Sequence, residues 1–140
     1  MTTSGRVNHK AALVPEERRL EFLPSLFGLP LLIVAENTVY NFMEWLSPLD
    51  YGGGFWNFYE YRGEPLFLAP TSKPRYRIAC RTNGYEGEVS AEAAGIIATL
   101  FTCSHLSFRH DSGLLVNGYH RLYDYCCDHP EASEIIQAID

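Results

Sequence analysis

The sequence has little of what membrane-spanning, secreted or disulfide-stapled proteins need. Its longest apolar run, Leu29 to Ala35, is too short to cross a bilayer, and no apolar segment follows the basic N-terminal residues as in a signal peptide. The cysteines lack both Cys-x-x-Cys spacing and the density of a disulfide scaffold; they are Cys80, Cys103, Cys126 and Cys127. We therefore expect a cytoplasmic, reducing setting with no membrane contact, in which the cysteines act as small buried hydrophobic side chains.

The common catalytic motifs are also missing. The three glycines Gly52, Gly53 and Gly54 are not followed by Lys-Ser/Thr and form no Gly-x-Gly-x-x-Gly, so they do not predict a phosphate loop. There is no Gly-x-Ser-x-Gly nucleophile elbow. The last third is rich in histidine and cysteine, but Cys126, Cys127 and His129 match no zinc-finger or ribbon spacing. We expect no catalytic residues, no metal and no cofactor; a small metal-dependent hydrolase that uses this last third is the alternative.

Positive charge is scarce as well. The chain has 17 acidic and 11 basic residues, a formal net charge of −6 and a pI near 5.3. Stable DNA binding needs a concentrated basic surface, so we expect none. The acidic excess is also too small for a mimic of DNA, because a duplex carries one negative charge per about 1.7 Å of its axis.

What is present indicates one globular domain. The chain has 140 residues, of which 46% are hydrophobic and 20% charged, and it contains no repeat or linker. The first twelve residues are polar and without periodicity, so we expect a flexible tail over 1–12 and a single compact domain over 13–140.

The N-terminal part of the domain predicts two helices and a short strand. Pro15 with the acidic residues after it suits a helix start, and the apolar spacing carries that helix to Leu23. Pro24 either ends this helix or starts another turn that Gly28 closes. The β-branched, apolar stretch from Leu31 to Val34 predicts a strand. A broad apolar stripe over Glu36 to Ser47 predicts a second helix, which Ser47-Pro48 ends.

The densest aromatic stretch, Tyr51 to Tyr61, follows directly on the glycines. Alternation of its side chains predicts a strand, and Arg62-Gly63 predicts a turn into a returning strand, so a hairpin is expected over about 54–69. Pro65 and Pro70 indicate that the returning strand lies at a sheet edge or is short. Most aromatic strands serve packing, so a glycine hinge leading into a core strand is the simplest interpretation, with a binding role as the alternative.

A second hairpin is expected over about 75–89. Arg75 to Arg81 alternates an apolar and a basic face, and Asn83-Gly84 is a strong hairpin signal because both residues accept positive φ. Glu86 and Glu88 on the returning strand are expected to pair with the arginines across the strands.

The C-terminal half predicts helices. Ser90 is a good N-cap for a helix to about Leu106 that is apolar nearly all round, and we expect it to be the central buried helix, with Gly95 marking close helix packing. Further helices are expected from Gly113 to about Cys127 and from Pro130 to Asp140. Together these helices and hairpins predict an α+β fold in which an antiparallel β-sheet packs against several α-helices.

Several specific strings follow one another from Val14 onward. They are Phe22-Leu-Pro-Ser-Leu-Phe-Gly28, Glu36 to Leu46, Tyr51-Gly-Gly-Gly-Phe-Trp56 with Phe58-Tyr59, Leu68-Ala-Pro70, Asn83 to Gly95 and the terminal Ala-Ile-Asp140. In their order and spacing these strings resemble the ArdB/KlcA antirestriction family. The resemblance implies an α+β protein, carried on plasmids and other mobile elements, that inhibits host type I restriction-modification enzymes and protects incoming DNA. Members are not known as enzymes, and the partner implied is the type I enzyme complex, contacted directly or indirectly.

The resemblance supplies no agreed set of functional residues, so the partner-binding site is a hypothesis from the residues themselves. Exposed glycine turns flanked by aromatic side chains let a partner come close. The candidate residues are Asp50, Tyr51, Gly52, Gly53, Gly54 and Trp56, with Asn83 and Gly84 of the second turn. The competing candidate is the acidic C-terminus, with Glu131, Glu134 and Asp140. Since the charge argues against a DNA mimic, either site is expected to act through contact with protein.

Overall fold

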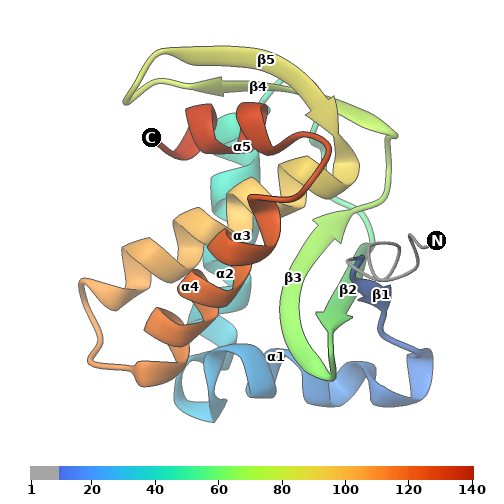
Figure 1. Ribbon diagram of the computed structural model, residues 1–140, viewed down its shortest axis with the longest axis vertical. Coiled ribbons are helices and arrows are strands. Elements are labelled where there is room, and N and C mark those ends of the chain that lie inside the picture. The colour runs from blue at the N-terminus through green and yellow to red at the C-terminus, as the bar shows by residue number, and fades with distance from the viewer. Residues whose placement is uncertain (1–9) are drawn as a thin grey trace, which may run out of the picture.

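The computed structural model describes residues 10–140, which form an α+β fold built around one helix (Figure 1). The elements in chain order are β1 (Ala12–Leu13), the 3-10 helix η2 (Glu16–Arg18), α1 (Arg19–Phe27), the 3-10 helix η3 (Leu29–Leu31), α2 (Leu32–Leu46), β2 (Trp56–Tyr61), β3 (Glu64–Pro70), β4 (Arg75–Cys80), β5 (Tyr85–Ser90), α3 (Ala91–Ser107), α4 (Gly113–Cys126) and α5 (Ala132–Ile139). The α+β class and both predicted hairpins are confirmed.

The strands form two separate antiparallel sheets, where the sequence predicted one. The first has the order β1-β2-β3 and the second, a ribbon, contains β4 and β5. Trp56 pairs with Pro70 and Tyr61 with Glu64, with a bulge between Tyr59 and Glu60. β3 lies at a sheet edge, as its prolines predicted, because proline cannot donate to a further strand.

Helix α3 is the central buried helix, as predicted. It contacts both sheets and the helices α2, α4 and α5. Figure 1 shows α3 crossing the middle of the molecule, with the β4–β5 ribbon at the top of the view and α1 at the bottom. Its start is the predicted N-cap: the Ser90 hydroxyl accepts the Ala93 amide at 3.1 Å.

Gly95 marks a point of close packing on α3. A Cβ at this position would lie 2.3 Å from the Leu68 carbonyl oxygen and 2.5 Å from the Ala69 Cα, both on β3. Gly95 therefore permits close packing of α3, as predicted, and the partner element is the strand β3. Thr99, one turn later, exchanges hydrogen bonds with the backbone of Leu68 at 3.4 and 3.5 Å.

One N-terminal prediction was wrong. Helix α1 continues for another turn through Pro24 to Phe27, which is one of the two predicted alternatives, and Gly28 follows as its C-cap. Leu31 to Val34, however, is helical, because η3 runs directly into α2. The predicted strand was favoured by local β-branched residues, but the buried stripe of the following helix begins at Ala35 and continues at helical spacing through Val39, Met43 and Leu46. Ile33 and Val34 are left largely exposed on the outer side of α2.

Residues 11 and 12, at the end of the predicted tail, contact the rest of the described chain. Ala12 pairs with Glu60 and Leu13 with Tyr59, while the Ala11 amide donates to the Tyr125 hydroxyl at 3.0 Å. The rest of the predicted tail, residues 1–9, lies outside the described residues.

Within residues 10–140, no single helix has the length and apolar character to cross a bilayer. The helical segments Glu16–Phe27 and Leu29–Leu46 are long and apolar enough only when taken together, and they meet at a bend of 93°.

We expect Gly95→Ala to lower the free energy of unfolding by about 3 kcal/mol, because the new methyl group meets backbone atoms of β3 that cannot move aside cheaply. Urea denaturation measures the loss. Gly113→Ala is the matched control, since a Cβ there meets no atom within 4 Å. Equal midpoints for the two variants would contradict the close packing of α3 on β3.

Candidate functional site

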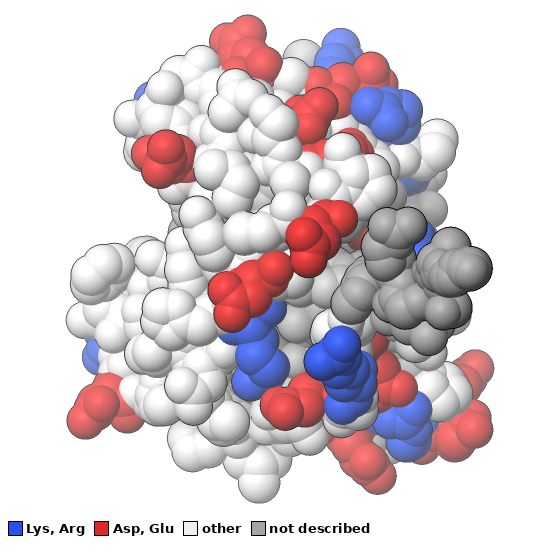
Figure 2. All heavy atoms as spheres, in the orientation of Figure 1, with Lys and Arg blue, Asp and Glu red and all other residues white. Residues whose placement is uncertain are grey.

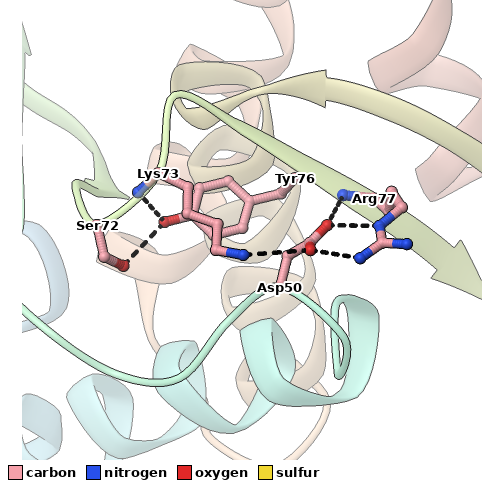
Figure 3. Close-up of polar contacts among 5 residues, drawn as sticks. All are labelled: Asp50, Ser72, Lys73, Tyr76 and Arg77. Atoms are coloured by element: carbon pink, nitrogen blue, oxygen red, sulfur yellow. Dashed lines mark hydrogen bonds and ion pairs between the residues drawn. The ribbon is translucent and has the colours of Figure 1, made fainter.

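The candidate site is the loop that joins α2 to β2 and crosses the ribbon beside β4. After Leu46 the chain turns sharply, with the Asp50 and Tyr51 amides both donating to the Ser47 carbonyl, at 3.3 and 2.9 Å. This turn points the Asp50 side chain at β4 (Figure 3).

Asp50 clamps the loop to β4. Its carboxylate accepts three hydrogen bonds from Arg77: from the backbone amide at 2.8 Å, from Nε at 2.9 Å and from Nη2 at 2.7 Å. The Lys73 Nζ atom lies 3.5 Å from Asp50 Oδ1. The bonds from the Arg77 side chain, then from its backbone amide, hold the pKa of the Asp50 carboxyl well below its usual range. Only 9% of the Asp50 side chain is exposed, so the carboxylate holds the loop against β4 and offers little surface to a partner.

Further contacts tie the glycine segment to the link between β3 and β4. The Ser72 hydroxyl donates to the Gly53 carbonyl at 3.3 Å, and both the amide and the hydroxyl of Thr71 donate to the Phe55 carbonyl. Behind this link, the hydroxyl of the buried Tyr76 accepts the Lys73 amide at 3.1 Å and lies 3.2 Å from the Ser72 hydroxyl (Figure 3). The loop is thus held along its length.

The glycines of this loop are not equivalent. Gly53 and Gly54 have φ of 97° and 110°, a region that favours glycine. Gly52 has no positive φ, and a Cβ there would meet no atom within 4 Å. The backbone at Gly52 is therefore open to a partner.

The predicted aromatic residues of the site are mostly buried. Trp56 is 3% exposed and its indole N–H donates to the Tyr51 hydroxyl at 3.1 Å. Both side chains lie inside the loop and support it. Phe55, which the sequence reasoning did not select, is 61% exposed, with the Arg19 guanidinium 4.5 Å from the centre of its ring.

A groove of about 500 Å³ opens next to Asp50. It lies between the end of α2 with the following turn and the β4–β5 ribbon, and it is lined mainly by Leu46, Pro48, Leu49, Ala79, Glu86 and Gly87. Leu49 is 75% exposed at its rim. Sequence reasoning missed this groove, and the available signal was an apolar residue placed in a turn between Pro48 and Asp50.

The structure joins the second predicted turn to the C-terminus. The Asn83 side-chain amide donates to the Ala138 carbonyl at 2.9 Å, and its oxygen accepts the Tyr85 amide. Gly84, with φ of 81°, completes the turn. Asn83 and Gly84 thus lie at the end of α5 that leads to the exposed Asp140, while the contacts of Asp50 are with Lys73 and Arg77.

The other two acidic candidates differ from each other. The Glu131 carboxylate accepts hydrogen bonds from the backbone amide and the hydroxyl of Ser90, so it is already bound within the protein at the start of α3. Glu134 is partly exposed on α5. Of the acidic C-terminal set, Glu134 and Asp140 retain surface for a partner.

The expected pairing of acids and arginines across the ribbon is realised for one pair. Arg75 lies 3.6 Å from Glu88. Arg77 pairs with Asp50 instead, and the Arg81 guanidinium lies over the Trp45 ring, 5.4 Å from its centre. The arginines therefore bind the ribbon to the α2 end and its loop.

The histidine- and cysteine-rich third does not form a metal site among residues 10–140, where no group of three or more His, Cys, Asp or Glu side chains could hold an ion. Burial raises the pKa of the Cys126 thiol to about 11. His129 lies 2.9 Å from Glu92 through Nε2, and its Nδ1 accepts the Glu131 amide. These contacts connect the α4–α5 link to α3, and the metal-hydrolase alternative has no support.

We expect Asp50→Asn to lower the melting temperature at neutral pH, because Arg77 loses its anionic partner. The folded pKa of Asp50 lies below its ordinary value of 3.8, so its contribution is complete above that pH and is lost as the pH falls below it. The difference between wild type and variant, followed by thermal unfolding across pH, should shrink in acid. Asp111→Asn, at an exposed residue without an ion pair in the described chain, is the control; a difference that persists in acid would contradict the clamp.

The comparisons with known proteins agree on one family. The profile of the family described as "Antirestriction protein" matches residues 49–140. The antirestriction protein KlcA of Escherichia coli is 40% identical over 136 residues, covering 93% of this chain and 94% of that protein. The putative antirestriction protein YubI of E. coli K12 is 35% identical over 134 residues, with 91% and 93% covered.

A solved structure extends the agreement to three dimensions. It has a TM-score of 0.82 and 40% identity, with 94% of each chain covered. It comes from work reporting that KlcA and ArdB have a novel fold and act against type I DNA restriction systems in vivo but not in vitro. By sequence and by fold, this chain belongs to the ArdB/KlcA family of antirestriction proteins.

Proposed function

We propose that this protein inhibits type I restriction enzymes by contacting protein, without mimicking DNA. Family membership supports this target, because the KlcA and ArdB proteins are described as active against type I DNA restriction systems. Their activity in vivo but not in vitro fits a contact with a state of the restriction complex, or with an intermediary, that exists in the cell. Such an inhibitor acts by binding and needs no catalytic group.

The distribution of acidic groups carries the argument against mimicry. Several carboxylates of the described chain are engaged within the protein, such as Asp50 with Arg77, Glu60 with Arg18 and Glu92 with His129. On the face in Figure 2, acidic and basic side chains are interspersed between uncharged areas. A strip imitating a phosphate backbone needs regularly spaced, unpaired negative charges.

The basic residues argue equally against direct DNA binding. Arg18, Arg75 and Arg77 form ion pairs within the protein, and Arg121 adds another with Glu64. Paired guanidinium groups release few counterions from DNA, and the net charge of −6 repels it.

We place the contact surface at the loop from Asp50 to Gly54, with Tyr51 and Trp56 as its internal support. The open backbone at Gly52 and the adjacent exposed Phe55 favour this loop. The surface formed by Asn83, Gly84 and Asp140 is the second candidate, favoured by the exposure of the C-terminal residue.

The target is tested by plating unmodified phage on cells that carry a type I system, with and without this protein. We expect expression of the protein to raise the plating efficiency, while a host without the restriction system shows no change. Full restriction in the presence of the folded protein would overturn the proposed function.

The loop is tested with Gly52→Gln. The substitution adds a long neutral side chain where the backbone needs no glycine conformation and a Cβ meets nothing, so folding should be unchanged. We expect antirestriction in the plating assay to fall strongly because the loop can no longer be approached closely. Gly113→Gln, at a second open glycine on α4, should keep full activity. Full activity of Gly52→Gln would remove the loop from the contact surface.

A further inference from the structure

The outer edge of β4 is open next to the groove. The backbone amide of Arg77 donates to the Asp50 carboxylate, so the N–H and C=O groups of Arg77 point away from β5. In an antiparallel pair these directions alternate, so those of Ala79, two residues later, also point outward. In the described chain β5 is the one strand that pairs with β4, and no backbone bond outside the ribbon involves Ala79. The Arg77 carbonyl and the Ala79 amide and carbonyl are thus available to another strand.

The groove borders β4 from Arg77 to Ala79, extends over the ribbon to Glu86 and Gly87 of β5, and has an apolar wall. Leu46 forms part of it at the end of α2, and the turn adds Pro48 with the largely exposed Leu49. A row of outward backbone groups next to an apolar wall is the arrangement used in β-strand addition, where the backbone supplies affinity and alternate side chains enter a pocket.

Charge at the rim narrows the chemistry of the occupant. Glu86 lies on β5 opposite Ala79, is exposed, and makes no ion pair with any described residue. The nearby cations are engaged, Arg77 with Asp50 and Arg81 with Trp45. An occupant with a basic side chain near its apolar one would therefore find a free carboxylate.

The ends of the open edge limit the occupant to a short segment. At one end of the open edge the Arg77 amide already donates to Asp50, and at the other end the turn of Asn83 and Gly84 closes the ribbon. A second copy presenting its own β4 would bring another Ser47–Asp50 turn to the same edge, and two chains of charge −6 repel each other.

We propose that this groove binds a short extended segment of a type I restriction subunit, which pairs with β4 at Ala79, buries an apolar side chain beside Leu46 and Leu49, and places a basic side chain at Glu86. The inference rests on the proposed function and names the partner chemistry for this face of the protein. It adds the groove to the surface that begins at Asp50.

Two substitutions test the two parts of the groove. Ala79→Pro removes the outward amide, and an edge position is where a strand tolerates proline. Leu49→Ser removes the exposed apolar side chain at the rim. Leu29→Ser is the matched control, since Leu29 is 74% exposed in η3, outside the groove. Thermal unfolding confirms that each variant is folded before binding is measured.

The probe is an overlapping set of short peptides that covers the subunits of a type I enzyme, titrated with the full-length protein. We expect peptides with an apolar residue near Lys or Arg to bind, and each groove variant to weaken binding by about tenfold or more, a loss of about 1.4 kcal/mol. Leu29→Ser should leave the affinity unchanged. Absence of binding to every peptide, or equal affinity of wild type and both groove variants, would overturn the inference.

Two further outcomes separate this inference from the proposed function. Antirestriction by wild type that persists in full in both groove variants overturns the groove alone, whereas no antirestriction by wild type overturns the proposed function. A concentration-dependent dimer that Ala79→Pro abolishes would assign the open edge to a second copy of this chain and would also overturn the inference.

Discussion

The close approach of α3 to β3 at Gly95 is the constraint on which the rest of the structure depends. A helix that is apolar nearly all round must be covered on every side, and here it meets both sheets and three other helices. Because Gly95 lets the β3 backbone come within the distance that a side chain would occupy, the three-stranded sheet can cover one side of α3 while α2 and α4 cover others. Ser90, at the junction of β5 and α3, then attaches the ribbon directly to the start of this helix.

A second, polar constraint holds the ribbon to the α2 end. Without Asp50, Arg77 would be an ordinary solvated arginine on a ribbon face; with it, the backbone and side chain of one β4 residue are bound to a loop far away in the sequence. The same contact leaves the next outward residue of β4, Ala79, beside an apolar turn. Strand β4 therefore carries a stabilising contact at Arg77 and, two residues later, the open edge that we propose for recognition.

The candidate site was predictable in part. Glycines at 52–54 and the pair Asn83-Gly84 predicted turns, and positive φ at Gly53, Gly54 and Gly84 agrees with that chemistry. Which side chains face outward was not predictable: Trp56 and Tyr51 turn inward and bond to each other, while Phe55 and Leu49 face solvent. Alternation along β2 placed Phe55 and Trp56 on opposite faces, but which face is covered depends on helices that the local pattern does not locate.

The sequence by itself determined the α+β class, both hairpins, the central helix with its Ser90 cap and, through its specific strings, the family. These features depend on periodicity, turn chemistry and capping, which act over a few residues. Only the tertiary structure decided that Leu31 to Val34 is helical, that the strands divide into two sheets, that Gly95 faces a strand, and that Asp50 binds Arg77 beside a groove. Each of those outcomes is set by contacts between segments far apart in the chain, whose packing free energy exceeds the local preferences that a sequence pattern reports.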